Sequence, residues 1–472
     1  MNTRKLLTLS GALAFAACGG GGEQVAGIDR GGIPTPAVSV VSQGAITGFG
    51  SVIVNGVTFD TSNAVFTVDG TAGSQSDLAV GQVIVVQGEL GDDATTGTAE
   101  RVTFDDAVEG PISAIDTATS TLTVLGQTVR VDADTSFDDS ITPASLDGLD
   151  IDDVIEVSGF YRADGSISAT RIEFRSVAGE FELTGQVSNA SGTTFEINGF
   201  VVDFSNANDL IGFPNGTPEN GQRVEAKGDT LNGAGELVAT RVEFKGVDFG
   251  EDGDRGELEG FITRFVSATD FDVEGITVTT NAQTSFENGT SADLALNRKV
   301  EVEGDINASG VLVATNVEIK ASGFIRIESL VEAKASNQLT VLGIVVTVDA
   351  ATRIEDKSSA GLEPFSLADI DVGNYVEIRG FEDSNGVVAT RLEREDFDGD
   401  VALRGFVDSV SEPDFTILGA NVMTVGATQF RDVTGTTMPA ADFFAQAEGA
   451  LVEATGTLNG ATIVASEVQF EN

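Results

Sequence analysis

Histidine and tryptophan are absent from the 472 residues of this chain, and cysteine occurs once, at Cys18. Without histidine the chain can form neither a Ser-His-Asp triad nor an imidazole zinc site, and a single cysteine cannot supply a thiolate cluster. The phosphate-binding pattern G-x-x-x-x-G-K-[ST] is missing as well. These absences remove most enzyme classes and leave a carboxylate-only hydrolase as the remaining catalytic alternative. We therefore expect a non-enzymatic protein.

Cationic side chains are scarce. The chain has 26 Lys and Arg against 74 Asp and Glu, for a formal net charge of −48. Such a charge repels nucleic acid and anionic lipid headgroups, and it attracts divalent cations and basic proteins. Stacking platforms for bases are also few, with two tyrosines and no tryptophan. We expect no nucleic-acid partner.

The most regular feature of the sequence is the pattern V-x-V-x-G, which recurs six times at spacings of 69 to 76 residues. A second mark, a hairpin pattern centred on glycine, accompanies each copy. The repeated glycines fall at Gly88, Gly159, Gly228, Gly304, Gly380 and Gly456 in the first mark and at Gly56, Gly126, Gly199, Gly275, Gly343 and Gly419 in the second. Two marks in one register indicate a small module copied in tandem.

Apolar and polar residues alternate inside each copy, which predicts strands with one buried face. About seventy residues with five such strands predict an all-β fold: a tandem array of six five-stranded OB-like β-barrel modules, with a two-sheet sandwich as the alternative. Short helical turns are expected at residues 366–371 and 439–446, and contacts between modules are expected to be limited. The predicted modules cover residues 44–109, 110–184, 185–259, 260–325, 326–404 and 405–472.

The N-terminus has the features of a bacterial lipoprotein leader. Arg4 and Lys5 precede an apolar run over residues 6–17, and a lipobox-like Phe15-Ala16-Ala17-Cys18 follows. We expect residues 1–17 to be the signal peptide, Cys18 to be the lipid attachment site, and residues 18–43 to be a flexible tether. No Asp follows Cys18, which favours the outer membrane. Ordinary signal-peptide cleavage is the alternative.

The first module resembles a known family. Its segment from Gly44 to Gly56 reads G-x-I-x-G-F-G-S-V-x-V-N-G, which is similar to the opening signature of a domain of unknown function that occurs in tandem in proteobacterial lipoproteins. Later copies share this resemblance through Gly110-Pro111-Ile112, Leu125-Gly126-Gln127 and endings such as Ala169-Thr170-Arg171-Ile172-Glu173. The resemblance implies tandem β-barrel modules on a lipid anchor. It brings no known activity and no catalytic residues.

A glutamate three residues before the module glycine recurs in five copies, as Glu156, Glu225, Glu301, Glu377 and Glu453. Alternation alone places a polar residue there. We expect these glutamates to lie on a solvated strand face and to pair across to Arg171, Arg241 or Arg391, with each pair contributing less than about 1 kcal/mol.

Two acidic loops are the candidate metal sites. They carry Asp248, Glu251, Asp252 and Asp254 between modules 3 and 4, and Asp396, Asp398 and Asp400 between modules 5 and 6. Carboxylates on glycine-rich loops suit Ca²⁺, although the closing glutamate of a twelve-residue calcium loop is missing. A solvated linker is the alternative for both loops.

Two functions remain open. The first is a non-enzymatic cell-envelope lipoprotein, a scaffold that binds envelope or extracellular proteins or glycans and responds to divalent cations. The second is an array of ligand-binding modules for a small molecule or glycan. Closely filled barrels would favour the first, and a cavity lined by aromatic and polar groups would favour the second.

Overall fold

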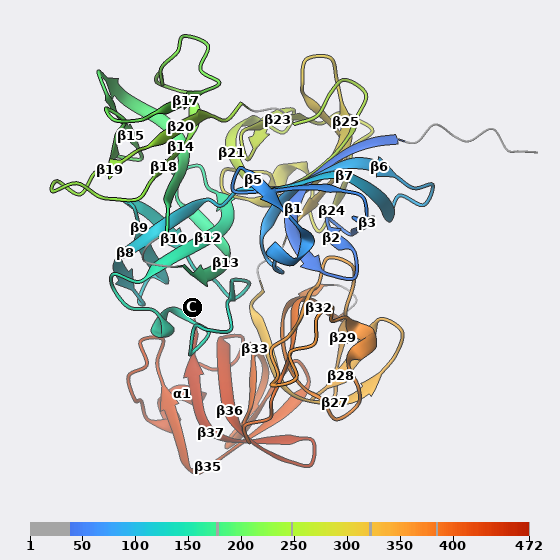
Figure 1. Cartoon of the computed structure of the whole chain (residues 1–472). Helices are drawn as coiled ribbons and strands as arrows, with labels where there is room; N and C mark the ends of the chain where they lie inside the picture. Colours follow the sequence, from blue (N-terminus) through green and yellow to red (C-terminus); the bar gives the residue numbers. More distant parts are fainter. Residues whose placement is uncertain (1–37, 176–178, 247–248, 321–322, 384–385, 472) are drawn as a thin grey trace, which may run out of the picture. The chain divides into compact units, whose positions relative to one another are not determined.

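The computed structural model describes residues 38–175, 179–246, 249–320, 323–383 and 386–471 (Figure 1). The expected signal peptide, Cys18, Asp248 and most of the expected tether lie outside these residues. The tether prediction was too long, because strand β1 (Val38–Gly48) already begins at Val38 and buries Val40 and Val41. In all six modules the first strand starts between one and six residues before the predicted boundary.

Each module follows the same closed strand path. In module 1, β1 pairs antiparallel with both β2 (Val52–Val54) and β6 (Val83–Leu90), and β2 pairs antiparallel with β3 (Val57–Asp60). Strand β3 then pairs in parallel with β7 (Thr96–Phe104), which returns antiparallel to β6. The path closes a single sheet on itself, as in an OB-like barrel. The OB-like prediction is confirmed, and the two-sheet sandwich is excluded.

The other elements repeat this path. Module 1 also contains β4 (Val65–Val68), β5 (Thr71–Gly73) and the 3₁₀ helix η1 (Gln75–Asp77). Module 2 consists of β8 (Val108–Asp116), β9 (Thr121–Val124), β10 (Gln127–Arg130), β11 (Ser136–Phe137), η2 (Leu146–Gly148), β12 (Val154–Tyr161) and β13 (Ile167–Phe174). Module 3 consists of β14 (Phe181–Ser191), β15 (Thr194–Ile197), β16 (Phe200–Asp203), β17 (Asp209–Ile211), β18 (Arg223–Gly228), β19 (Leu237–Val238) and β20 (Arg241–Phe244).

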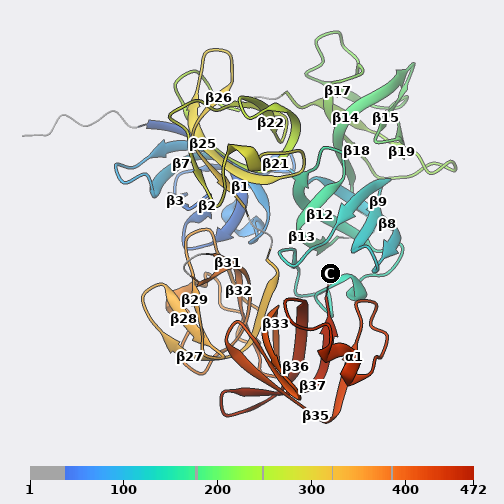
Figure 2. The same cartoon turned by 180° about the vertical axis from the view of Figure 1, so that it is seen from behind.

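The C-terminal half has the same organisation, and Figure 2 shows its strands from behind. Module 4 consists of β21 (Arg255–Ser267), β22 (Asp270–Val273), β23 (Ile276–Thr279), β24 (Ser285–Glu287), η3 (Ser291–Asp293), β25 (Lys299–Ile306) and β26 (Leu312–Ile319). Module 5 consists of β27 (Ile325–Lys334), β28 (Gln338–Val341), β29 (Ile344–Thr347), β30 (Arg353–Asp356), η4 (Leu367–Asp369), β31 (Tyr375–Asp383) and β32 (Gly386–Glu395). Module 6 consists of β33 (Val401–Ser411), β34 (Asp414–Ile417), β35 (Ala420–Arg431), the helix α1 (Ala440–Phe444), β36 (Leu451–Asn459) and β37 (Thr462–Phe470).

Both predicted helical turns are present, as η4 and α1. Phe443 of α1 is fully buried and packs against Phe415, Phe430 and Phe470 of the module 6 core, so α1 closes one end of that barrel. Within the described residues, no helix is long and apolar enough to cross a membrane.

The two glycine marks have different physical reasons. The hairpin glycines have φ between 72° and 84°, and the residue before each has φ between 44° and 55°. Two successive positive φ values define a type I′ turn, as the Asn55-Gly56 pair predicts. The V-x-V-x-G glycines instead lie where the fourth strand crosses close to the fifth. A Cβ at Gly456 would lie 2.1 Å from the carbonyl oxygen of Val464, and the other five have the same clash at 2.1 to 2.4 Å.

Modules join through the first half of their first strands. In module 1, β2 pairs with β1 only from Ile46 onward, so the edge of β1 before Ile46 stays open within the barrel. Unpaired backbone groups at a strand edge need a pairing partner or a covering segment. Strand β21 of module 4 supplies it by parallel pairing at Val40–Gln43 of β1. The same half-strand is used in the antiparallel pairs β8–β14 and β27–β33.

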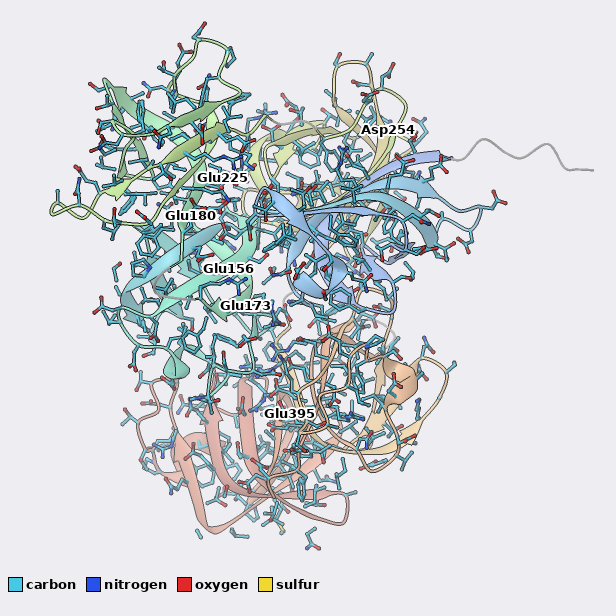
Figure 3. All side chains as sticks on the ribbon, viewed as in Figure 1. Glu156, Glu173, Glu180, Glu225, Asp254 and Glu395 are labelled. Carbon is cyan, nitrogen blue, oxygen red and sulfur yellow. The ribbon has the colours of Figure 1, made fainter. Side chains whose placement is uncertain are left out.

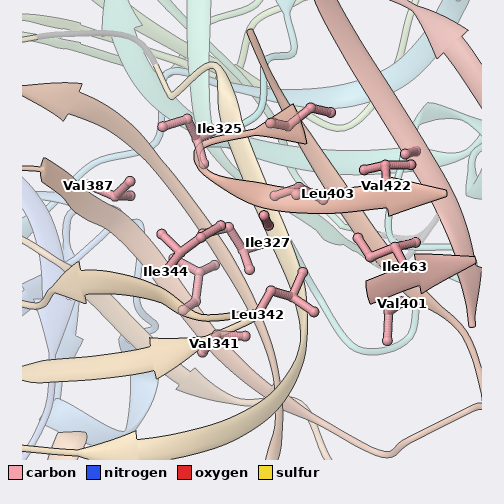
Figure 4. Close-up of a cluster of buried hydrophobic side chains, with 14 of the residues drawn as sticks. Ile325, Ile327, Val341, Leu342, Ile344, Val387, Val401, Leu403, Val422 and Ile463 are labelled. Atoms are coloured by element: carbon pink, nitrogen blue, oxygen red, sulfur yellow. The ribbon is translucent and has the colours of Figure 1, made fainter. Parts of the chain in front are cut away.

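The prediction of limited contacts between modules was therefore wrong. The three pairings unite the modules, two by two, into sheets of 13, 13 and 11 strands. Modules 5 and 6 also share one hydrophobic core, in which Ile327 of β27 lies near Leu403 of β33 (Figure 4). Modules 2 and 3 share another core. The partly open barrel explains this result, because each module leaves one strand edge unpaired and a second module pairs with it.

Candidate functional site in the buried charges between modules

The recurring glutamates do not all face solvent. Glu156, Glu225 and Glu377 are only 2%, 0% and 6% exposed, so the prediction of a solvated strand face is wrong for these three (Figure 3 labels two of them). The side chains of Glu301 and Glu453 are 12% and 21% exposed. For one of the three, a neighbouring module contributes to the burial. Glu156 is reached from module 1 by Gln82, whose Nε2 donates to it at 3.4 Å.

The expected arginine partners are mostly different as well. Only Glu377 pairs as predicted, with its Oε1 3.0 Å from Nη2 of Arg391. Arg171 contacts Glu173 and Glu355, and Arg241 contacts Glu243. The repeated arginines are thus engaged mainly by acids on their own strand or on another module.

Three buried arginines form what we call the arginine junction: the repeated Arg171 and Arg391, and Arg353 of β30. Each donates a hydrogen bond to a backbone carbonyl of a different module. Arg391 reaches Thr135 at 2.7 Å, Arg353 reaches Thr170 at 3.1 Å, and Arg171 reaches Val80 at 3.1 Å. All three side chains are buried. The junction therefore joins module 2 to modules 1 and 5.

Carboxylates keep the arginine junction charged. Nη2 of Arg391 lies 3.0 Å from Glu377 and 3.3 Å from Glu393. Burial alone lowers the pKa of Arg391, but Glu393 and Glu377 outweigh it and raise that pKa. Burial likewise raises the pKa of Glu377, but Arg379, Arg326 and Arg391 outweigh it and hold that pKa well below its usual range. The Arg391–Glu377 pair therefore remains ionised.

A second cluster, the Asp106 cluster, gathers five acids from three modules: Asp69, Asp106, Glu109, Glu156 and Glu182. Carboxylate oxygens of Asp69, Asp106 and Glu182 lie within 4.8 Å of one another, and so do those of Asp106, Glu109 and Glu156. Asp106 belongs to both groups. It lies between β7 and β8, in the segment that connects modules 1 and 2.

Two cations flank the Asp106 cluster. Nε of Arg175 donates to Glu156 at 2.8 Å and lies 3.9 Å from Glu109. Nζ of Lys227 contacts Oε2 of Glu182 and donates to the backbone oxygen of Asp69 at 3.0 Å. Two cations therefore face five acids, and neither contacts the carboxylate of Asp106.

Burial and mutual repulsion raise the pKa values of Asp106, Glu109 and Glu156. Burial raises the pKa of Glu156 to about 8 and that of Glu109 to about 7, although Arg175 lowers both. It raises the pKa of Asp106 well above its usual value, and the carboxylates of Glu182 and Glu156 add to that shift. The cluster thus has a strong tendency to take up positive charge.

A further buried acid, Glu257, gives a testable pH dependence. It lies on β21, opposite Ser42 of β1, with 4% exposure and no partner at Oε2. Burial raises its pKa from 4.5 to about 7. Glu303 and Glu301 act in the same direction, and a Ser42 hydrogen bond and Arg255 oppose it. Because the folded pKa exceeds the unfolded one, ionisation destabilises the fold, and the penalty grows as the pH rises from 4.5 to 7.

We expect Glu257→Gln to remove this penalty. The variant should have a higher free energy of unfolding than wild type at pH 8, by up to about 3 kcal/mol, and nearly the same at pH 4.5. Urea unfolding at both pH values measures the difference. An equal difference at the two pH values would mean that the side chain of Glu257 does not titrate with folding.

The structure describes six of the seven predicted calcium ligands, all except Asp248, and does not bring three of their carboxylates together. Asp254 accepts the backbone N–H of Glu251 at 2.8 Å, Asp398 accepts that of Asp400 at 3.1 Å, and Asp396 accepts that of Ser359 at 3.0 Å. In the described part of the chain, groups of three convergent carboxylates occur only in the Asp106 cluster. These loop acids instead accept hydrogen bonds from backbone N–H groups, and the bonds of Asp254 and Asp398 are local.

Two of the cavities that open between modules bear on the functional site. One, of 290 Å³, has a lining that includes Phe160, Phe261, Arg162 and Lys299, with Arg162 stacked 4.6 Å from the ring centre of Phe261. The other, of 370 Å³, includes Asp106 in its lining. The barrels themselves are filled by apolar side chains.

Comparison with known proteins identifies the repeated unit. A family model described as a domain of unknown function (DUF5666) matches the chain six times, at residues 40–103, 109–173, 184–243, 259–318, 326–393 and 404–469. No curated protein gives a significant match. Among solved structures, the chain is similar to Drosophila Unr CSD456, with 13% identity over 45% of this chain and 95% of that chain. The TM-score of 0.11 is too low for that likeness to carry any argument.

Proposed function

Because this chain belongs to the DUF5666 family of domains of unknown function, we propose its function from its own structure. We propose a non-enzymatic cell-envelope scaffold, in which six docked β-barrel modules present an acidic surface to envelope or extracellular partners. One observation carries the proposal: the first-strand edges and two of the three repeated arginines, Arg171 and Arg391, join modules to one another. An array built this way is suited to holding a fixed surface.

The attachment proposed for this scaffold is a lipid on Cys18, with the outer membrane as its place. It is supported by the leader-like sequence before Cys18 and by the missing Asp after it. The −48 charge of the chain fits basic partners or divalent cations better than nucleic acid.

Cys18→Ala tests the anchor. We expect the variant to leave the detergent phase in a phase-partitioning assay and to keep an unprocessed leader, because the acyl chains and the lipoprotein cleavage site are both lost. Cys18→Ser, which keeps the size of the side chain, should behave in the same way. A variant that still partitions into detergent and is processed like the parent would contradict lipidation.

The scaffold role is tested by capture from envelope extracts. The full chain should retain basic proteins at low salt and release them at high salt, because surface charge attraction is screened. A control bait with Asp396, Asp398 and Asp400 changed to Asn separates the contribution of that acidic loop. Retention that is independent of salt, or no retention above empty resin, would speak against an acidic binding surface.

A second candidate function, ligand binding, is supported by the 290 Å³ cavity with its aromatic and charged lining. A melting-temperature screen with glycans and small metabolites tests it. Binding that Ala351→Phe abolishes, because the larger side chain at the lining fills the cavity, would favour this function over the scaffold.

A further inference from the structure

The side chain of Asp106 is the least explained feature of the structure. It is 2% exposed, and neither of its carboxylate oxygens has a hydrogen-bond partner within the described residues. Burying a carboxylate without a partner is strongly unfavourable, so such a group needs an opposite charge or a proton. The carboxylates of Glu109, Glu156 and Glu182 lie within 3.9 Å of Arg175 or Lys227. The carboxylate of Asp69 accepts the backbone N–H of Asp106.

The surroundings of Asp106 have the geometry of a cation site. Two oxygens that bind one Ca²⁺ at about 2.3–2.6 Å lie no more than about 5 Å apart. The carboxylate oxygens of Asp69, Asp106 and Glu182 meet that condition, at 4.8 Å or less. Glu182 also has a free oxygen for an ion, because Lys227 contacts its Oε2 and its Oε1 is buried without a partner.

We propose that Asp69, Asp106 and Glu182 bind a divalent cation, with Glu109 and Glu156 behind Asp106 as additional negative charge. The donor set is made only of carboxylate oxygens, which selects a hard cation of the Ca²⁺ class over zinc or copper. A divalent ion offsets most of the excess of five carboxylates over the two cations, Arg175 and Lys227.

The proposed site would tie three modules together. Asp69 follows β4 in module 1, Asp106 lies in the connection to module 2, and Glu182 lies on β14 of module 3, opposite Glu109 of β8. The site is different from the two acidic loops predicted from the sequence. It concerns the folded modules alone, so it stands or falls independently of the lipid anchor and the envelope partners.

Equilibrium dialysis of the full chain with radioactive Ca²⁺ tests the site, at constant ionic strength and pH 7.5. We expect wild type to retain Ca²⁺, and Asp106→Asn to lose affinity by about tenfold or more, because the central ligand loses its charge. Asp398→Asn makes the same chemical change in an exposed loop and should retain Ca²⁺ like wild type. The melting temperature should rise with Ca²⁺ over chelator in wild type and in Asp398→Asn, and should not change in Asp106→Asn.

Asp106→Asn is nearly isosteric and removes a buried charge, so we expect it to fold. Glu182→Gln is the second variant and should also lose Ca²⁺ affinity. Equal Ca²⁺ binding by wild type and both variants would overturn the proposal. The proposal would also be overturned if the melting temperature of wild type did not change with Ca²⁺ and rose only on acidification. Protons would then neutralise the cluster.

Discussion

Gly456→Ala is expected to lower the free energy of unfolding by about 3 kcal/mol or more, a large effect for one methyl group. The added Cβ would lie 2.1 Å from the carbonyl oxygen, 2.8 Å from the carbonyl carbon of Val464 and 2.9 Å from Cα of Ala465. All three atoms belong to the backbone of β37, so no side-chain rotation relieves the clash. The pairing of β36 with β37 must shift, and it lies next to the core shared by modules 5 and 6.

Gly426→Ala is the matched control in the same module. Gly426 has an ordinary φ, and a Cβ there meets no atom within 4 Å. We expect this variant to stay within about 0.5 kcal/mol of wild type. Urea unfolding of the full chain, followed by far-ultraviolet circular dichroism, compares the two. If both variants unfold alike, β36 can move away from β37 at little energetic penalty.

Arg391→Met has the second large effect, an expected loss of about 3–5 kcal/mol. Methionine keeps much of the arginine's apolar stem but removes the guanidinium. Glu377 and Glu393 then lose a buried partner, and the carbonyl oxygen of Thr135 loses its donor. The stability of Arg391→Lys should lie between that of Arg391→Met and that of wild type, because a single ammonium cannot reproduce the planar set of donors.

Arg264→Met controls for the loss of an arginine as such. The side chain of Arg264 is 41% exposed and pairs with Asp270 and Asp272 at 2.7 and 2.6 Å. Exposed pairs contribute less than about 1 kcal/mol, so this variant should be nearly as stable as wild type. Thermal unfolding at neutral pH ranks the variants. Equal losses for Arg391→Met and Arg264→Met would show that the buried junction is no stronger than a surface pair.

The sequence predicts what is decided within a module. Strand alternation, the Asn55-Gly56 turn and the V-x-V-x-G spacing depend on contacts a few tens of residues apart at most, and all are found in the barrels. Even the close approach of β36 to β37 at Gly456 can be seen in the sequence, because only glycine fits there and glycine therefore recurs at this position.

The contacts between modules have no comparable repeated pattern in the sequence. Glu156 and Glu301 occupy the same position of the same pattern, but one is buried and the other is partly exposed. The difference depends on which module lies against each strand, and a single sequence does not encode that choice locally. Asp106 is a similar case. Its only local signal is its place beside Asp105, directly before the buried residues of β8, and this resembles any acidic linker.

The parallel pair β1–β21 has a consequence for synthesis. Residues 40–43 pair with residues 255–258, so the edge of the first module waits for more than two hundred further residues to be made. At about 5–20 residues per second, that delay is on the order of 10–40 s. During it, β1 presents unpaired backbone groups to any neighbouring chain. A cell that makes this protein must therefore keep nascent copies apart, or keep them unfolded, until the fourth module has emerged.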